Sequence, residues 1–535
     1  MRGGPPHLTD CVILIHPPVA KPSEPPAGLA ALCGALSEAG VAHTAVDAAL
    51  EGALWLLERG PHGPADTWTR RAFSHLDGDL ACLRDRKGYA GFDRYRKAVS
   101  EVNRVLEKSS PAGTRVGLAD YGHDSLSPVR SADLLQAALR HEENVFYPYF
   151  RARLSPLVEA GGPGALVGFS LNYLSQALCA FAMMGFLRLK FPAVKIAVGG
   201  GLVSAWMSSP AWRDPFGGLI DHLVPGPGES FLLSLAGAGA SGGGAASVGS
   251  APDGRTCPSF DAFPLDRYLA PGPILPYAAA RGCYWGRCSF CPEKSQGATF
   301  SARRPGEAAA DLSRLSARHR PVLIHLVDNA ISPALMRALI ASPPPAPWYG
   351  FARVTDELGD FDFCRDLRSS GCVMLKLGIE SGDQGLLDVL GKGTSAETAA
   401  KALAALKRAG IGTYVYLLFG TPSEDLARAR KTLAFAVRNS ASIDFLNLAI
   451  FNLPAGCREA RELDLRPFYA GDLSLYSDFV HPSGFGRREV RAFLERELRA
   501  HPAIRPIVLR RPPYFTSNHA PLFCLGREPF RDAAR

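Results

Sequence analysis

Three cysteines lie within nine positions of this 535-residue sequence, in the stretch RGCYWGRCSFCP that begins at Arg281. Cys283, Cys288 and Cys291 can surround one metal centre, because glycines relieve the loop and a proline closes it. A structural zinc ion almost always takes four protein ligands, and no second Cys-x-x-Cys or His-x-x-x-His pair lies near enough to complete one. Cysteine thiolates also hold [4Fe–4S] clusters, and three of them leave one iron open to a ligand. The loop therefore favours an iron–sulfur cluster, with zinc as the alternative.

The remaining cysteines are scattered, which is too dilute for a disulfide scaffold, so we expect most of them to be small buried residues. Hydrophobic residues make up 47% of the chain and charged residues 21%, which is typical of a globular protein. The net charge of +8 includes no block of Lys and Arg, so no nucleic-acid partner is expected. We find no apolar run long enough for a secretory signal or a membrane span, and we expect a cytoplasmic protein.

Short apolar strands alternate with helical segments in the first part of the chain, which predicts a doubly wound parallel α/β sheet of the Rossmann-like class. CVILI, VAHTAV, ALVGFS, VKIAVGG and IDHLV are the expected strands, and residues 52–160 are expected to be a largely helical insertion. Ligands bind such sheets beyond the carboxyl ends of the strands. The candidate residues there are Ser170, Gly199, Gly200, Gly226, Gly228 and Glu229.

The same alternation returns after the Gly/Ala/Ser-rich segment 236–256, which has the composition of a flexible linker. Two sequences in this second part have the form of capping boxes, Thr394–Glu397 and Thr421–Glu424, and each is expected to open a helix. The pattern predicts a partial (β/α) barrel over residues 257–480, after a first domain over 1–235 and before a C-terminal extension over 481–535. The cysteine loop, Asp328, Arg353 and Glu380 fall at expected strand ends, where barrels collect their chemistry.

The cysteine loop resembles the cluster motif of the radical S-adenosylmethionine enzymes, which usually space their thiols CxxxCxxC with an aromatic residue before the last. Here Phe290 takes the aromatic place, and four residues rather than three separate Cys283 from Cys288. The resemblance implies that Cys283, Cys288 and Cys291 hold a [4Fe–4S] cluster that binds S-adenosylmethionine. LKLGIESGD resembles the family's fourth-strand motif, which implies that Glu380 lies near the ribose.

Three further positions follow from the same resemblance. VLGKGT resembles the family's lysine-bearing turn, with capping of the preceding helix as the alternative role of Lys392. Asp328 stands where many members carry a motif for the methionine amino group. Arg353 would pair with the methionine carboxylate or form a structural ion pair.

The first domain is similar to the cobalamin-binding domain that precedes the barrel in one large subgroup of these enzymes. The similar stretches are HPP with the following Pro-rich loop, VGFS, VGGG and GPGE. The subgroup's D-x-H-x-x-G signature is absent, as it is in many members, so the lower face of a bound cobalt would be open or otherwise filled. His16 is expected to be a loop or core histidine.

The resemblance implies reductive cleavage of S-adenosylmethionine to a 5′-deoxyadenosyl radical, followed by cobalamin-dependent C-methylation of a small molecule or peptide. A flavodoxin or ferredoxin would supply the electron. One alternative is a radical rearrangement, oxidation or cyclisation without cobalamin. A tRNA methylthiotransferase would need a second three-cysteine cluster, which Cys11, Cys33 and Cys82 do not reproduce. A non-catalytic zinc-binding module is the remaining alternative.

Overall fold

The computed structural model describes residues 11–162, 164–209, 212–237, 256–295, 297, 299–455, 457 and 459–527. The chain forms two compact units. The first extends to Gly272 and also contains Ala470–Leu475, and the second contains Pro273–Tyr469 and the residues from Tyr476 onward. The predicted linker, residues 236–256, lies almost wholly outside the described residues.

The first unit is built on a five-stranded parallel sheet, as predicted. Its strands, in spatial order, are β2 (His43–Asp47), β1 (Val12–His16), β5 (Leu166–Ser170), β6 (Lys195–Gly199) and β7 (His222–Val224). Every residue of β1 and β5 is buried, which explains their unbroken apolar sequences. Numbered along the chain, the order is 2-1-3-4-5, the flavodoxin-like doubly wound arrangement.

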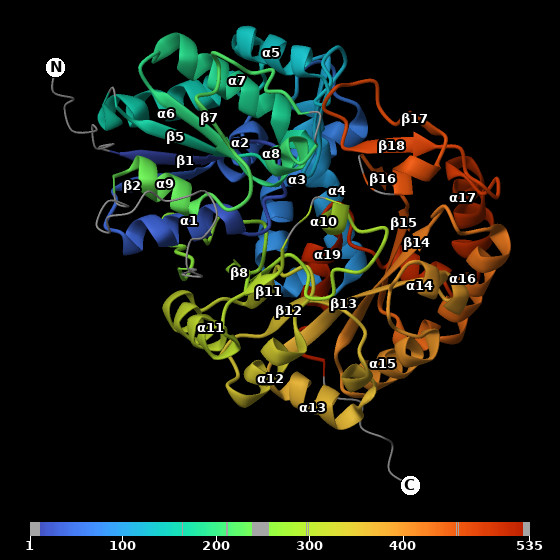
Figure 1. Ribbon diagram of the computed structural model, residues 1–535. Coiled ribbons are helices and arrows are strands. Elements are labelled where there is room, and N and C mark those ends of the chain that lie inside the picture. The colour runs from blue at the N-terminus through green and yellow to red at the C-terminus, as the bar shows by residue number, and fades with distance from the viewer. Residues whose placement is uncertain are drawn as a thin grey trace, which may run out of the picture. The chain divides into compact units, whose positions relative to one another are not determined.

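Helices cover both faces of this sheet (Figure 1). On one face lie α1 (Ala27–Glu38) and α9 (Glu229–Leu235), and on the other lie α2 (Ala48–Leu57), α6 (Tyr147–Gly161) and α7 (Leu174–Lys190). The short helix α8 (Gly201–Met207) follows β6 directly. The strand ends at the carboxyl edge are therefore joined to helix starts by short loops.

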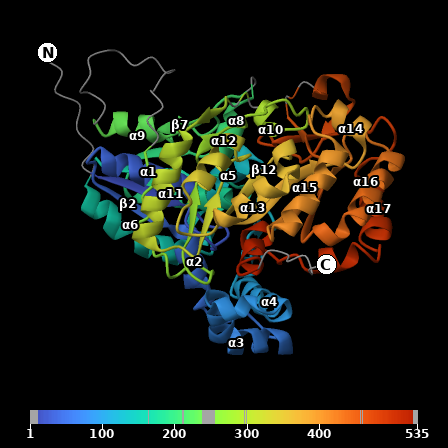
Figure 2. The ribbon, with the colours of Figure 1, turned by 90° about the horizontal axis from the view of Figure 1, so that it is seen from below.

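The segment between β2 and β5 is mainly helical, as predicted. It contains α3 (Thr67–Arg84), α4 (Phe92–Lys108), α5 (Ser131–Leu139) and a small hairpin of β3 (Thr114–Val116) with β4 (Tyr121–His123). Helices α3 and α4 lie side by side (Figure 2). Glu101 on α4 holds them together through an ion pair with Arg71 and a hydrogen-bond contact with His75 on α3.

Residues 256–272 belong to the first unit, whereas the sequence placed the start of the barrel at 257. Tyr268 donates a hydrogen bond to the carboxylate of Asp47 at 2.6 Å, and Ser259 N donates to Ala30 O at 2.9 Å. The later segment Ala470–Leu475 joins the same unit, where Ser131 N donates to Asp472 Oδ1 at 2.9 Å. These contacts are formed by tertiary packing, which composition does not reveal.

The second unit is built on a six-stranded sheet whose strands are parallel neighbours in chain order. They are β8 (Ile274–Tyr277), β11 (Leu323–Leu326), β12 (Trp348–Ala352), β13 (Cys372–Glu380), β14 (Gly412–Phe419) and β15 (Phe445–Ile450). Along one side run α11 (Pro305–His319), α12 (Pro333–Ala341), α13 (Phe361–Ser369), α15 (Ala396–Arg408) and α16 (Leu426–Arg438) (Figure 1). Repeated strand–helix units in this order form the predicted partial (β/α) barrel.

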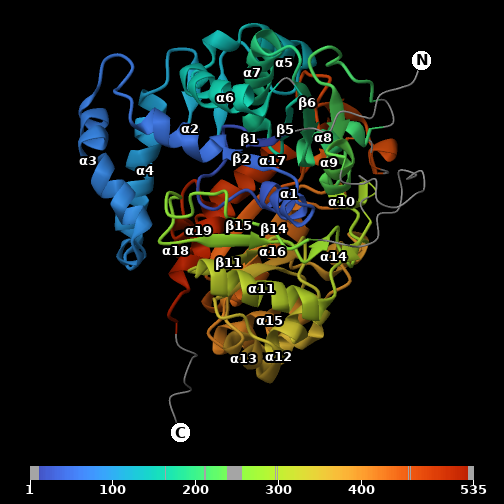
Figure 3. The same cartoon turned by 90° about the vertical axis from the view of Figure 1, so that its left-hand side faces the viewer.

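The residues after β15 stay with the barrel. They form a small sheet of β16 (Leu453–Pro454), β18 (Tyr476–Phe479) and β17 (Leu465–Pro467), and the helices α17 (Arg487–Phe493), α18 (Arg505–Leu509) and α19 (Thr516–His519). Figure 3 shows α18 and α19 beside β15. Arg527 pairs with Asp444 at 2.9 Å, directly before β15, so the last described residues cover the amino ends of the strands. Among the residues that the structure describes, no helix is both long and apolar enough to cross a bilayer.

Candidate functional site

The cysteine loop follows β9 (Ala280–Arg281), which pairs with β10 (Ser301–Ala302), and it ends at α10 (Pro292–Ser295). All three thiols are partly exposed, unlike the buried Cys372 in β13. Burial raises the pKa of Cys288, Lys392 lowers it, and Cys291 raises it. Burial likewise raises the pKa of Cys291, the backbone amides of Glu293 and Lys294 lower it, and Cys283 raises it. The three thiols are thus electrostatic neighbours in one loop.

Glu380 ends β13 and forms an ion pair with Lys392, with Oε1 and Nζ 2.9 Å apart. Glu380 has a φ of 67°, and the pairing of β13 with β14 shifts register between Gly378 and Glu380. Such a bulge changes the direction of a side chain at the end of a strand. Gly378 provides the room, because a Cβ there would lie 2.5 Å from Glu380 Oε1.

Lys392 belongs to the turn Leu390–Gly393, here called the lysine turn, which follows α14 (Gln384–Val389). Its backbone N–H donates to Leu387 O at 3.0 Å and so closes the end of α14, while its side chain reaches Glu380. The helix-capping role considered from the sequence is therefore filled by the backbone, while the resemblance to the family's lysine-bearing turn stays a prediction. Lys392 Nζ also lies 5.8 Å from the centre of the Phe290 ring.

Arg353, one residue past β12, is directed to the same turn. Its guanidinium donates to the carbonyls of Lys392 and Gly393, the latter at 2.6 Å, and lies 3.7 Å from the centre of the Trp285 ring. Arg353 Nε and the Tyr284 hydroxyl are both buried beside the cysteine loop. Burial raises the pKa of Tyr284 and the neighbouring Arg353 lowers it, so these two groups interact with each other.

The other predicted positions have structural contacts. Phe290 packs against a hydrophobic cluster that contains Phe451 and Leu453. Asp328 is 1% exposed, and its Oδ2 accepts a hydrogen bond from Ala279 N at 3.2 Å. Asp328 therefore ties the loop after β11 to the segment between β8 and β9. Its role toward S-adenosylmethionine stays a prediction.

Among the described residues, no three or more His, Cys, Asp or Glu side chains lie close enough together to hold one metal ion. The three cysteines share a loop, but their sulfur atoms do not form such a site. The assignment of these thiols to a cluster therefore also stays a prediction.

The glycine-rich candidates of the first unit gather at the carboxyl edge of its sheet. Asn172, which the sequence did not single out, joins two of the loops: its Nδ2 donates to Ser170 Oγ at 3.0 Å and its Oδ1 accepts from Gly201 N at 2.9 Å. Gly200 has a φ of 107°, and a Cβ there would lie 2.5 Å from Leu171 O. Ser204 Oγ accepts from Gly226 N at 2.8 Å and joins the next loop. Gly199 is the last residue of β6, and Gly228 and Glu229 lie at the start of α9, after the loop that follows β7.

His16, at the end of β1, is 6% exposed and lies within hydrogen-bond distance of Gln176 Nε2 at 3.3 Å. Burial lowers the pKa of His16, and Asp47 and a backbone hydrogen bond to Ser170 raise it. His16 is a core histidine, one of the two roles expected for it.

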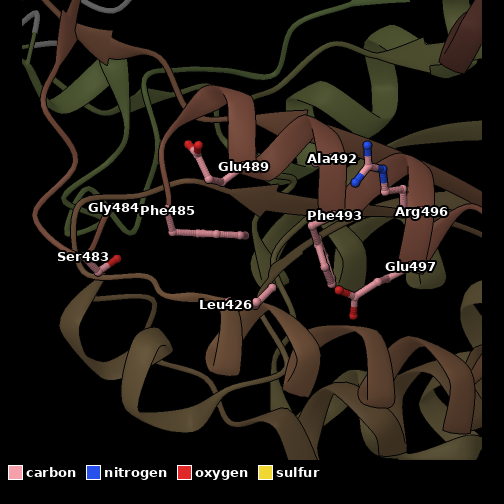
Figure 4. A pocket seen from close by; sticks show the side chains of 9 residues that line it. All are labelled: Leu426, Ser483, Gly484, Phe485, Glu489, Ala492, Phe493, Arg496 and Glu497. Atoms are coloured by element: carbon pink, nitrogen blue, oxygen red, sulfur yellow. The ribbon is translucent and has the colours of Figure 1, made fainter.

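A cavity of about 370 Å³ lies in the second unit beside α16 and α17 (Figure 4). Its lining residues are Leu426, Ser483, Gly484, Phe485, Glu489, Ala492, Phe493, Arg496 and Glu497. None of them is a predicted site residue, so this cavity adds nothing to the cysteine-loop site.

No protein-family model matches the sequence. An uncharacterized methyltransferase of Pyrococcus horikoshii is 25% identical over 209 residues, which cover 38% of the chain and 44% of the relative. Two anaerobic magnesium-protoporphyrin IX monomethyl ester cyclases also match. The protein of Cereibacter sphaeroides is 28% identical over 29% of the chain and 27% of its own length. The protein of Rubrivivax gelatinosus is 27% identical over 41% of the chain and 44% of its own length. The chain thus spans less than half the length of each of these relatives.

Two solved structures align over most of the chain. The radical S-adenosylmethionine methyltransferase TsrM from Kitasatospora setae, with cobalamin and a [4Fe–4S] cluster bound, aligns with 85% of the chain and 75% of its own, at 15% identity and a TM-score of 0.49. The cobalamin-dependent S-adenosylmethionine radical enzyme OxsB has a structure with aqua-cobalamin and S-adenosylmethionine bound. The alignment covers 82% of the chain and 53% of OxsB, at 15% identity and a TM-score of 0.48.

Proposed function

We propose that the chain is a radical S-adenosylmethionine enzyme that uses cobalamin to methylate a carbon atom of a small molecule or peptide. The observation that supports this most is the placement of a three-thiol loop beside the Glu380–Lys392 pair in a barrel of parallel strands. The chain resembles the cobalamin-dependent members of that family in its motifs and in the order of its two α/β units. The methyltransferase named among its relatives agrees with this reaction class.

The residues present offer the types of donor that the proposed groups need. Cys283, Cys288 and Cys291 would hold the [4Fe–4S] cluster, since they are the partly exposed thiols of one loop. Arg353 lies against Trp285 of that loop, and its guanidinium carries the positive charge that would pair with an anionic group such as a carboxylate. Glu380 offers carboxylate oxygens that can accept from ribose hydroxyls.

The first unit would hold cobalamin at the carboxyl edge of its sheet, where Asn172 and Ser204 fix the glycine-rich loops. His16 is buried and would not reach a cobalt ion from below. When bound, the cluster supplies the electron that cleaves S-adenosylmethionine and cobalamin supplies the methyl group. The protein orients these groups and excludes water, and a flavodoxin or ferredoxin would deliver the electron.

Metal analysis tests the proposal. The full chain would be purified without oxygen, reconstituted with iron, sulfide and hydroxocobalamin, and desalted. About four irons and one cobalt per chain are expected. Four irons without cobalt would favour a radical rearrangement, oxidation or cyclisation instead. Bound zinc without stable iron would overturn the proposed enzymatic function and favour a non-catalytic metal-binding module.

A further inference from the structure

The longer spacer between the first two cysteines contains a side chain that spans from one loop to another. Trp285 donates its indole N–H to Gly391 O at 2.9 Å. Ser289 N, one residue past Cys288, donates to Leu390 O at 3.0 Å. The cysteine loop is therefore hydrogen-bonded to the lysine turn at two points, on either side of Cys288.

Arg353 holds the indole and the turn together. Its guanidinium carbon lies 3.7 Å from the centre of the Trp285 ring, and the same group donates to the carbonyls of Lys392 and Gly393. Stacking on tryptophan uses the flat face of the guanidinium, and its N–H groups donate in the plane from its edge, so one side chain can do both. Arg353 thus links β12, the cysteine loop and the lysine turn.

Glycine is required at two positions of the lysine turn for this contact. A Cβ at Gly393 would lie 2.0 Å from Trp285 Cζ2, and one at Gly391 would lie 2.8 Å from Arg287 O. Both residues also have positive φ, 64° at Gly391 and 63° at Gly393. The two glycines that flank Lys392 therefore allow the cysteine loop to approach the lysine turn closely.

We propose that Trp285 is a positioning residue that fixes the cysteine loop on the lysine turn. The contact sets Cys288 relative to Lys392, whose ammonium is paired with Glu380. Trp285 is the second of the four residues in the spacer between Cys283 and Cys288. The purpose of positioning Cys288 in this way rests on the proposed function. The contact between Trp285 and the lysine turn does not itself require a bound cluster.

Alkylation of the metal-free full-length chain tests the contact directly. Iodoacetamide labelling at fixed pH, followed by peptide mass spectrometry, gives a rate for each cysteine. Trp285→Ala should raise the rates of Cys283 and Cys288 about tenfold, because a stacked cation and a hydrogen bond are lost and the loop opens more often. Trp285→Phe should give an intermediate rate, since stacking remains and the N–H is lost. Cys372 should stay unreactive throughout, which reports an intact barrel.

Gly393→Ala gives the second arm. It should raise the same rates, and its effect should be smaller in the Trp285→Ala background, because the clash with the ring is gone while the strain of alanine at a positive φ remains. Gly306→Ala, whose added Cβ meets no atom within 4 Å, is the control and should change nothing. Rates in Trp285→Ala within about twofold of the unmodified chain would overturn the inference, as would a Gly393→Ala effect that persists in full without the indole. If Cys372 becomes reactive in Gly393→Ala, that variant has disturbed the barrel. The alkylation rates of the Trp285 variants then decide the inference by themselves.

The same experiment separates this inference from the proposed function. A chain that binds no iron on reconstitution would overturn the proposed function, while the alkylation rates would still test the contact. Conversely, a loaded cluster with unchanged alkylation in Trp285→Ala would leave the proposed function standing and overturn the positioning role.

Discussion

The Lys392 ammonium and the Glu380 carboxylate meet at 2.9 Å above Gly378, and both side chains are largely shielded from water. Removing one partner of a shielded ion pair leaves the other charge uncompensated. The pair therefore depends on the missing Cβ of Gly378 as much as on its own two residues.

Gly378→Ala should disturb this pair without unfolding the barrel, because the atoms that the new Cβ meets are the ends of flexible side chains. We expect S-adenosylmethionine affinity to fall about tenfold, as for Glu380→Ala, with iron content unchanged. Equilibrium dialysis of the reconstituted chain measures the affinity. Gly385→Ala, whose Cβ would lie 3.5 Å from Asp383 Oδ1, is the matched control. Unchanged affinity in both Gly378→Ala and Glu380→Ala would show that Glu380 is an ordinary strand-end carboxylate.

Alanine at Cys283, Cys288 or Cys291 should abolish cluster loading and 5′-deoxyadenosine formation, because the proposed cluster has only these three protein ligands. Cys372→Ala should retain both, since that thiol is fully buried at the start of β13. Iron content and the visible absorption of the cluster after reconstitution measure the difference. Equal loss of iron in Cys372→Ala would show that the ligands are wrongly assigned.

Gly228→Phe should block cobalamin at the carboxyl edge of the first sheet. A Cβ at Gly228 makes only an ordinary contact with Leu32, so the ring is tolerated and projects from the loop after β7. Cobalt per chain should fall to near zero while iron is retained. Gly217→Phe, at an exposed turn before β7 with no neighbour within 4 Å, is the matched control and should keep its cobalt. Full cobalt retention in Gly228→Phe would place the cofactor elsewhere.

Glu424→Gln should change the pH dependence of stability. Burial raises the pKa of Glu424 to about 8, although the backbone amides of Gly420 and Thr421 lower it. The folded chain therefore keeps a proton that the unfolded chain releases between about pH 4.5 and 8, so this group makes unfolding easier as pH rises through that window. Glutamine cannot titrate and can still accept from Gly420 N, which bonds the Glu424 carboxylate.

The melting temperature of Glu424→Gln relative to the unmodified chain should thus rise by roughly 5 °C between pH 5 and pH 8. Thermal unfolding followed by circular dichroism at these two pH values measures it. Glu462→Gln, at an exposed position, should show no such trend. A relative melting temperature that is flat with pH would mean that Glu424 is ionised in the folded chain.

Much of this architecture could be predicted from local sequence. Short apolar strands and the helices between them indicated both sheets, because a buried parallel strand must be apolar on both faces. The two expected capping boxes were each misplaced. Ser395 rather than Thr394 caps α15, and Asp425 rather than Thr421 caps α16, because a tight turn with Glu424 N bonded to Thr421 O precedes that helix.

Sequence analysis could predict only those residues of the candidate site that stand within one short motif. The three cysteines and Glu380 stand in recognisable stretches, whereas the contact of Trp285 with Gly391 joins residues 106 positions apart. The glycines flanking Lys392 and the tryptophan in the spacer were visible, but no local rule connects them. Asn172 and Ser204 were missed for the same reason, since their bonds join loops that follow different strands.

The chain leaves the first unit at Gly272, returns to it for Ala470–Leu475, and then re-enters the second. No single cut in the sequence can divide the two units, because each is made of two separate pieces of chain. A fragment that stops near residue 272 would lack the strap in which Asp472 bonds Ser131 N. A protease that nicks the chain once near that position would yield two polypeptides that co-purify, one with the whole Rossmann-like sheet and the other with the strap that packs on it.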